Sequence, residues 1–348
     1  IDWLVRGLGD GGIFAIPIVC LVFAAGGAFE NMQEEIIAMV PALLMLTQRL
    51  GFDALTAAEM SVGAAAVGSA FSPINPFQVL IAQKVAGVPQ LSGASFRLLF
   101  LALALLLFLL GTMRHARHTR VPISRVASTT EERAFTARGK SVLAIVLLTF
   151  AVFGYGVAEL HWDFDQEAAL FFAMGCIVGI VGRLGVTGTA EAFVEGFQSM
   201  AYAALLIGFA RSISTVMEQG LIIDTVVNGL ASSLAMLPVA FAALGMMAAH
   251  AAIHVAVPSV SGQAVLTLPV FAPVADLLHL SRQVAVLAYQ YGAGMCELVT
   301  PTNGALMAVL AAAGVRYDEW IRTAGKTIAV VSLAGAVAVV SAVVIGLT

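Results

Sequence analysis

Long apolar stretches are the feature that most restricts how this sequence can fold. Residues 96–113 (FRLLFLALALLLFLLGTM) contain a single charged residue and approach the ~20 residues that a helix needs to cross a bilayer. Charged residues make up only 11% of the chain, against about 25% in ordinary globular domains. Strand patterns are weak throughout, so the sequence predicts an all-α polytopic membrane protein. Comparable apolar stretches lie at 141–160, 167–184, 192–217 and 327–347.

Proline and polar residues interrupt the apolar stretch 54–87. As one straight helix it would measure about 50 Å, which exceeds the thickness of a bilayer core. Pro73 and Pro76 lack an N–H donor, and each disfavours helical geometry at the residue before it. Asn75 can cap a second half-helix that begins at Pro76. The sequence therefore predicts a broken helix, unwound around Ser72–Asn75.

A second apolar stretch, 283–314, is interrupted in the same way by "TPTN" at residues 300–303. Either Thr302 or Asn303 can cap a half-helix over 304–313. We therefore predict a second broken helix with an unwound centre.

Two further regions have the pattern of a re-entrant hairpin, 12–49 and 240–278. In each, two apolar arms flank a small polar tip, at 30–35 and at 257–263. Arms of ~22–26 Å are short for a hydrocarbon core of ~30 Å. Non-helical backbone at this depth is tolerated where protein buries it or where it lines a wet cavity.

The hairpin and broken helix recur as an internal repeat. A shift of 228 positions aligns Pro73 with Pro301 and Asn75 with Asn303, and it also aligns Pro41 with Pro269. The repeats are predicted to span 1–113 and 141–348. The shift also leads us to expect further residues in front of residue 1.

The segment 114–140 between the repeats holds seven of the 17 Lys and Arg residues. Such a basic linker is expected on the cytoplasmic side. Counting spans outward from it, the first hairpin opens to the cytoplasm and the second to the outside, so the repeats are inverted. We interpret the linker as a topology signal and expect no nucleic-acid partner. The chain is expected to be a multi-pass protein of the cytoplasmic membrane, in contact with lipid.

Inverted repeats with broken helices are typical of secondary transporters, whose sites lie near the membrane midplane. Half-helix N-termini suit a carboxylate, and neutral oxygens suit Na⁺. Ser72, Asn75, Thr300 and Asn303 are the candidate Na⁺ ligands. H⁺ coupling would need Glu297 or an acid of the first tip, and no other cofactor is expected. The predicted site comprises Ser72, Pro73, Ile74, Asn75, Thr300, Pro301, Thr302 and Asn303 at the breaks, and Asn31, Glu34, Ser259, Ser261, Gly262 and Gln263 at the tips.

Three segments carry a resemblance to a known family: "AVGSAFSPINPFQVLIAQKVAGVP", "PSVSGQAVLTLPVFAPVADLLHLSRQVAVLAYQYGAG" and "LVTPTNGALMAVLAAAGV". They resemble the YfcC-like carriers, relatives of the anaerobic C4-dicarboxylate carriers in the ion transporter superfamily. The resemblance implies a homodimer that works as an elevator, with Na⁺ or H⁺ coupling and a dicarboxylate or amino-acid substrate. It places Ser72, Asn75, Thr300, Thr302 and Asn303 at the paired sites, and Ser259, Ser261 and Gln263 at one tip.

The sequence departs from the resemblance in two respects. Relatives have an additional segment in front, and many carry an acid where this chain has Ala293, with Glu297 nearby instead. The second departure leaves the number and type of coupling ions open. The apolar spans 96–113, 141–160, 167–184 and 327–347, which have few polar residues, are expected to form the scaffold that meets lipid and the dimer partner.

Three other functions remain as alternatives. The first is an amino-acid exchanger without cation coupling. The second is an intramembrane hydrolase with Ser261 as nucleophile and His254 or His250 as base, although a hydrolase has no need for a second break. The third is a channel, which would not explain hairpins that open to opposite sides.

Overall fold

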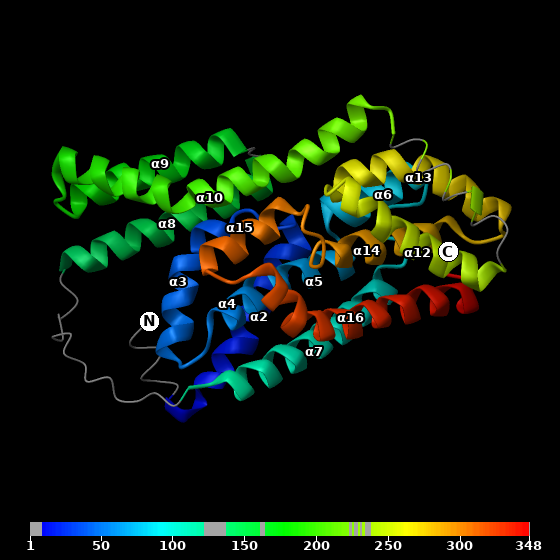
Figure 1. Ribbon diagram of the computed structural model, residues 1–348, viewed down its shortest axis with the longest axis horizontal. Coiled ribbons are helices and arrows are strands. Elements are labelled where there is room, and N and C mark those ends of the chain that lie inside the picture. The colour runs from blue at the N-terminus through cyan, green and yellow to red at the C-terminus, as the bar shows by residue number, and fades with distance from the viewer. Residues whose placement is uncertain are drawn as a thin grey trace. The chain divides into compact units, whose positions relative to one another are not determined.

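The computed structural model describes residues 9–121, 137–160, 164–222, 225, 229, 232–233 and 238–347, and no strand occurs among them (Figure 1). Five helical stretches in this part of the chain are long and apolar enough to cross a membrane. The chain is therefore a multi-pass membrane protein. The five stretches are Gly12–Glu30, Ala54–Phe71, Ala94–Thr119, Val260–Leu277 and Tyr317–Ile345.

Contacts divide the chain into two compact units, of which Ser124–Ala201 is the smaller. In this unit α8 (Ala137–Leu160) packs on α9 (Phe164–Val181). The start of α10 (Gly185–Gln219) approaches α9 where Gly175 leaves room for the ring of Phe193. The predicted linker 114–140 is helical at both ends, and its residues 122–136 lie outside the described part.

The larger unit, Ile1–Ile123 with Tyr202–Thr348, contains both hairpins and both broken helices. The first hairpin and broken helix comprise the 3₁₀ turn η1 (Gly9–Phe14), α2 (Ala15–Glu30), α3 (Ile36–Arg49), α4 (Ala54–Ala58), the π-helical turn η2 (Glu59–Gly63), α5 (Ala64–Phe71), the π-helical turn η3 (Pro76–Leu80) and α6 (Ile81–Ala86). The second comprise α12 (Val239–Ala256), α13 (Val260–Leu277), α14 (Arg282–Cys296) and α15 (Gly304–Ala313).

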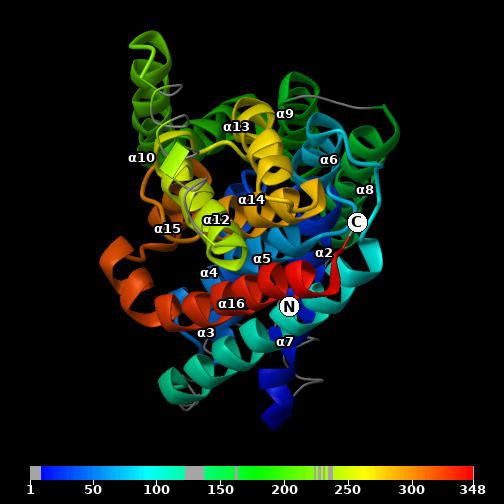
Figure 2. The same ribbon diagram turned by 90° about the vertical axis from the view of Figure 1, so that its right-hand side faces the viewer.

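Two long helices complete the larger unit, α7 (Ala94–Thr119) and α16 (Tyr317–Ile345). They lie side by side (Figures 1 and 2). Gly111 of α7 leaves room for the side chain of Thr327. The sequence grouped these two spans with α8 and α9 as scaffold. In the structure α7 packs on α5 and α16 packs on α14, within the same compact unit as the hairpins.

Packing within the larger unit is reciprocal. The first arm of each hairpin packs on the broken helix that follows it, α2 on α5 and α12 on α14. The second arm packs on a half-helix that lies far away in the sequence, α3 on α15 and α13 on α6. The centre is formed by α5 against α14, so each half of the sequence supplies helices that cover the other half.

The contact between α2 and α5 depends on two glycines. A Cβ atom at Gly27 would overlap the carbonyl oxygen of Ala65, and one at Gly68 would overlap that of Ala24. Small residues that allow backbones to approach this closely are typical of membrane helix pairs. The close approach also brings the end of the first hairpin arm next to the first break.

We predict that Gly27→Ala or Gly68→Ala lowers stability by about 1–3 kcal/mol, because the added methyl group forces two backbones apart. Thermal unfolding in detergent, followed by fluorescence-detected gel filtration, measures the loss. Gly325→Ala in α16 is the matched control, since its nearest new contact is an ordinary 3.8 Å. Equal melting temperatures for all three variants would contradict the role of the close approach.

Candidate functional site at the two helix breaks

At the first break, α5 ends at Phe71 and the chain resumes as the π-helical turn η3. Asn75 is buried and caps the new turn, with its Oδ1 accepting bonds from the N–H groups of Phe77 and Gln78, both at 2.9 Å. Its Nδ2 donates to the carbonyl oxygen of Gly27 at 2.8 Å. The same side chain therefore restarts the helix and holds the end of the first hairpin arm.

Ser72 makes a parallel link in the same break. Its hydroxyl donates to the carbonyl oxygen of Ala28 at 2.7 Å and accepts from the N–H groups of Ile74 and Asn75 at 3.1 and 3.0 Å. Both polar side chains predicted here are thus engaged with the hairpin end. Pro73 and Ile74 between them are half-buried.

At the second break, Asn303 caps α15 through a bond from the N–H of Leu306 at 3.2 Å, and its Nδ2 donates to the carbonyl oxygen of Glu297 at 3.1 Å. The hydroxyls of Thr300 and Thr302 lie 2.8 Å apart. Thr302 donates to the carbonyl oxygen of Val255, near the end of α12, at 2.7 Å. This break is therefore tied to the second hairpin, while Pro301 between the threonines is exposed.

The tip of the first hairpin contacts both breaks. Ser69, in the last turn before the first break, donates to Oδ1 of Asn31. Two residues further along the tip, Nε2 of Gln33 donates to Oε2 of Glu297 at 2.5 Å, at the second break. The sequence singled out Glu34 here, but Glu34 is exposed and interacts with Glu297 only electrostatically among the contacts described. Gln33 was missed.

The tip of the second hairpin bonds mainly within its own hairpin. Ser259 caps α13 by accepting from the N–H of Gly262 at 3.3 Å. Gln263 donates to the carbonyl oxygen of His250 at 2.8 Å, and its Oε1 lies 2.8 Å from Nδ1 of His254. Ser261 is half-buried and Gly262 exposed. These four predicted residues therefore shape the hairpin, and in the described contacts they do not bond to either break.

A buried chain of amides behind the first break was also missed. Gln290 of α14 donates to the carbonyl oxygen of Ser72 at 2.7 Å. Gln78 donates to the carbonyl oxygen of Gln290 at 3.2 Å, and its Oε1 lies 2.8 Å from the hydroxyl oxygen of Ser69. The available signal was the spacing of Gln283 and Gln290 in an apolar segment. Seven residues are two helical turns, so the two amides share one face.

Arg97 of α7 belongs to the same network. Its guanidinium is fully buried and donates to Oε1 of Gln290, Oε1 of Gln283 and the carbonyl oxygen of Ser92, at 2.8, 2.8 and 2.9 Å. All three acceptors are uncharged, and no described carboxylate lies within ion-pair distance of Arg97. A positive charge is therefore held two hydrogen bonds away from the first break.

Comparisons with known proteins agree with this architecture. A profile of the family described as "C4-dicarboxylate anaerobic carrier" matches residues 1–344. The chain is 33% identical to the Escherichia coli protein named "Putative basic amino acid antiporter YfcC", over 99% of this chain and 72% of the relative. It is 29% identical to a Haemophilus influenzae protein, over 94% of this chain and 67% of the relative.

The chain also resembles a solved structure, the YdaH transporter of Alcanivorax borkumensis. The TM-score is 0.50 at 17% sequence identity, covering 99% of this chain and 84% of the other. At this identity the resemblance concerns the fold alone. The match over residues 1–344, together with the identity to the Escherichia coli relative, shows that this chain is a membrane transporter that belongs to the C4-dicarboxylate anaerobic carrier family.

Proposed function

We propose that the chain is an ion-coupled secondary transporter of a small carboxylate-bearing solute, either a C4-dicarboxylate or an amino acid. One observation carries the proposal. The tip of the first hairpin bonds to both breaks, through Asn31 to Ser69 and through Gln33 to Glu297. Two capped half-helices and a polar tip that converge inside a membrane protein supply the groups from which transporters build solute and ion sites.

Arg97 supports a solute with a carboxylate group. A buried cation whose partners are all neutral favours a negative charge nearby. Both solute classes carry a carboxylate, so this charge does not separate them. The second candidate function is an amino-acid exchanger without cation coupling; the word antiporter in the name of the Escherichia coli relative favours exchange of amino acids and says nothing about cations. Ion dependence of uptake separates the two.

The reciprocal packing of the larger unit supports inverted repeats and an elevator mechanism. In this proposal the hairpins, the broken helices, α7 and α16 move as one body, because they pack on one another. The smaller unit, with α8, α9 and the start of α10, is the fixed scaffold in the cytoplasmic membrane. The scaffold also supplies the contact with a second copy in a homodimer.

Size measurement tests the dimer. We expect the protein to have the mass of a homodimer in mild detergent and in lipid nanodiscs, because a fixed scaffold needs an anchor against which the larger unit can move. Multi-angle light scattering over a dilution series measures this mass. A monomer at every concentration in both environments would contradict the fixed-scaffold elevator.

Na⁺ is the coupling ion in this proposal. Hydroxyl and amide oxygens of Ser72, Asn75, Thr300 and Asn303 surround the breaks, and unwound backbone offers carbonyl oxygens beside them. H⁺ is the alternative, because Glu297 is a buried titratable group in the second break.

We expect Asn75→Ala and Asn303→Ala to weaken and shift the Na⁺ dependence of solute uptake by proteoliposomes. Each variant removes a ligand candidate and also a helix cap that contributes about 1 kcal/mol. Ser281→Ala is therefore the matched control. It removes the cap of α14, where Ser281 accepts from the N–H of Val284 at 3.3 Å, without touching either break, and its Na⁺ dependence should match that of the wild type.

Two other outcomes of the uptake measurements would each identify a different mechanism. Wild-type uptake that ignores Na⁺ but follows a pH gradient, and that disappears in Glu297→Gln, would replace Na⁺ with H⁺. Uptake driven by neither gradient, but accelerated by solute on the far side, would support the exchanger.

The bond between Gln33 and Glu297 gives a separate prediction. A hydrogen bond to a charged group contributes about 1.5–3 kcal/mol, so Gln33→Ala and Glu297→Ala should each weaken apparent solute affinity by about tenfold or more. The double variant should be little worse than either single one, since both remove the same bond. Additive losses in a double-mutant cycle of KM values would mean that the two side chains act independently.

The rival functions fit the geometry less well. In a hydrolase, His254 or His250 would activate Ser261, but none of the described hydrogen bonds joins either histidine to Ser261, and the described partners of their Nδ1 atoms are Gln263 and Thr267. A channel would show uptake that increases linearly with solute concentration. Saturable uptake that depends on an ion gradient would argue against both.

A further inference from the structure

Glu59 is a buried acid that the proposed transport site does not use. It lies in the π-helical turn η2, within the apolar stretch Ala54–Phe71. Its exposed fraction is 1%, and its Oε2 has no hydrogen-bond partner among the residues that the structure describes. A carboxylate so placed is costly in a membrane, and intramembrane acids commonly mark ion or proton pathways. Single π-helical turns inside α-helices also occur frequently at functional sites.

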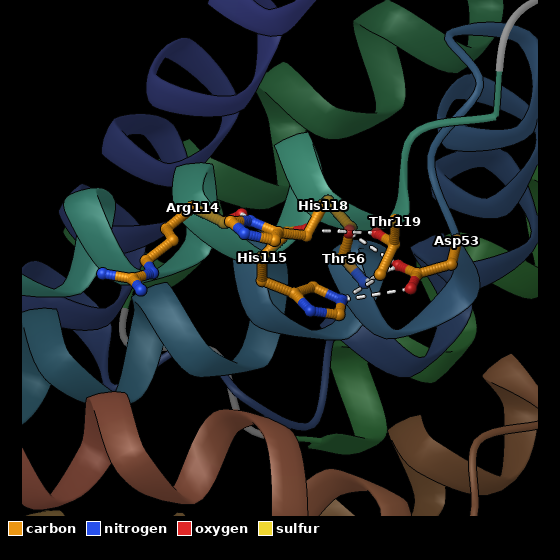
Figure 3. A network of polar contacts seen from close by, with 6 residues as sticks. All are labelled: Asp53, Thr56, Arg114, His115, His118 and Thr119. Carbon is orange, nitrogen blue, oxygen red and sulfur yellow. Dashed lines mark hydrogen bonds and ion pairs between the residues drawn. The ribbon is translucent and has the colours of Figure 1, made fainter.

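An ion pair lies at the start of the same helix (Figure 3). Asp53 caps α4 by accepting from the N–H and hydroxyl of Thr56 at 2.8 and 2.6 Å. Nε2 of His115, on α7, lies 3.0 Å from Oδ2 of Asp53. The side chains of His115 and Asp53 are 14% and 37% exposed. The pair is therefore more accessible to solvent than the buried Glu59.

Asp53 is the fixed negative charge of this pair. Burial alone would raise the pKa of Asp53, but the hydrogen bonds from His115 and Thr56 lower it well below its ordinary value. Asp53 therefore remains ionised at neutral pH. The imidazole of His115 is the group of the pair that can gain and lose a proton there.

Electrostatic neighbours of Glu59 come from several elements. The charges of His115 and Asp53 interact electrostatically with the carboxyl group of Glu59. Glu59 in turn interacts electrostatically with the thiol of Cys20 on α2. The carboxyl group of Glu319 on α16 interacts electrostatically with the imidazole of His115. Among the described residues, no three His, Cys, Asp or Glu side chains are grouped to hold a metal ion. The chemistry around Glu59 therefore fits a proton better than a metal cation.

We propose that Glu59 is an intramembrane proton-binding site, which exchanges its proton with solvent through the His115–Asp53 pair. In the transfer an N–H bond of the imidazolium breaks as an O–H bond forms on the Glu59 carboxylate. The neutral imidazole then takes its next proton from solvent. This site lies apart from Glu297, and the proposal does not depend on which ion or solute uses the breaks.

The test is infrared spectroscopy of the full chain in lipid during a pH titration, which reports the C=O stretch of a protonated carboxyl group. We expect one such band to be absent in Glu59→Gln and retained in Glu191→Gln, an exposed acid of α10 that serves as control. In His115→Gln the band should titrate about one pH unit higher, because the unpaired Asp53 carboxylate then opposes a second negative charge. Glu297→Gln should retain the Glu59 band. A failure of the proposal about the coupling ion at the breaks can therefore be told apart from a failure of the proposal about Glu59.

Three results would overturn the proposal. The first is an unchanged spectrum in Glu59→Gln, and the second is a band that Na⁺ removes at constant pH. The third is a titration that His115→Gln leaves unaltered. This last variant also keeps the proposal testable if Glu59→Gln fails to fold, since it leaves the buried acid in place.

Discussion

Unwound backbone inside a bilayer has to find all its hydrogen-bond partners within the protein, and much of this structure follows from that requirement. At the second break, Trp320 and Tyr317 donate to the carbonyl oxygens of Leu298 and Val299 at 2.8 and 2.5 Å. At the first, Gln290 donates to the carbonyl oxygen of Ser72. The two breaks therefore need α16 and the amide face of α14, because these helices supply hydrogen-bond donors for the unwound backbone.

The bonds around the breaks are of two kinds. Those from Asn75, Ser72 and Thr302 to the hairpin ends reach backbone carbonyl groups, which cannot rotate away without distorting a helix. Those from the tip of the first hairpin join one side chain to another, as between Gln33 and Glu297. Side-chain bonds can reorient around a solute while the backbone remains fixed. The first tip is therefore the part of the site best suited to respond to a ligand.

Sequence reasoning located the breaks because proline and asparagine act locally. Pro76 and Asn75 restart a helix through their own geometry, and α15 begins and ends where the pattern placed it. Partners across the fold were harder to find, since a glutamine such as Gln33 resembles any loop residue until packing brings Glu297 to it. The π-helical turn at Glu59 has no local sequence pattern either. The grouping of α7 and α16 as scaffold stays a prediction, because composition does not show which apolar helices pack on one another.

The reciprocal packing has a consequence for how the chain is made. Helix α3 packs on α15, whose first residue, Gly304, leaves the ribosome long after α3 has been inserted. Until then one face of the first hairpin lacks the half-helix on which it packs. Helix α6 lacks its packing partner α13 for a shorter time, since α13 is synthesised earlier than α15. The first half of this protein therefore reaches the membrane as an incomplete body, and its assembly ends only with the last quarter of the chain.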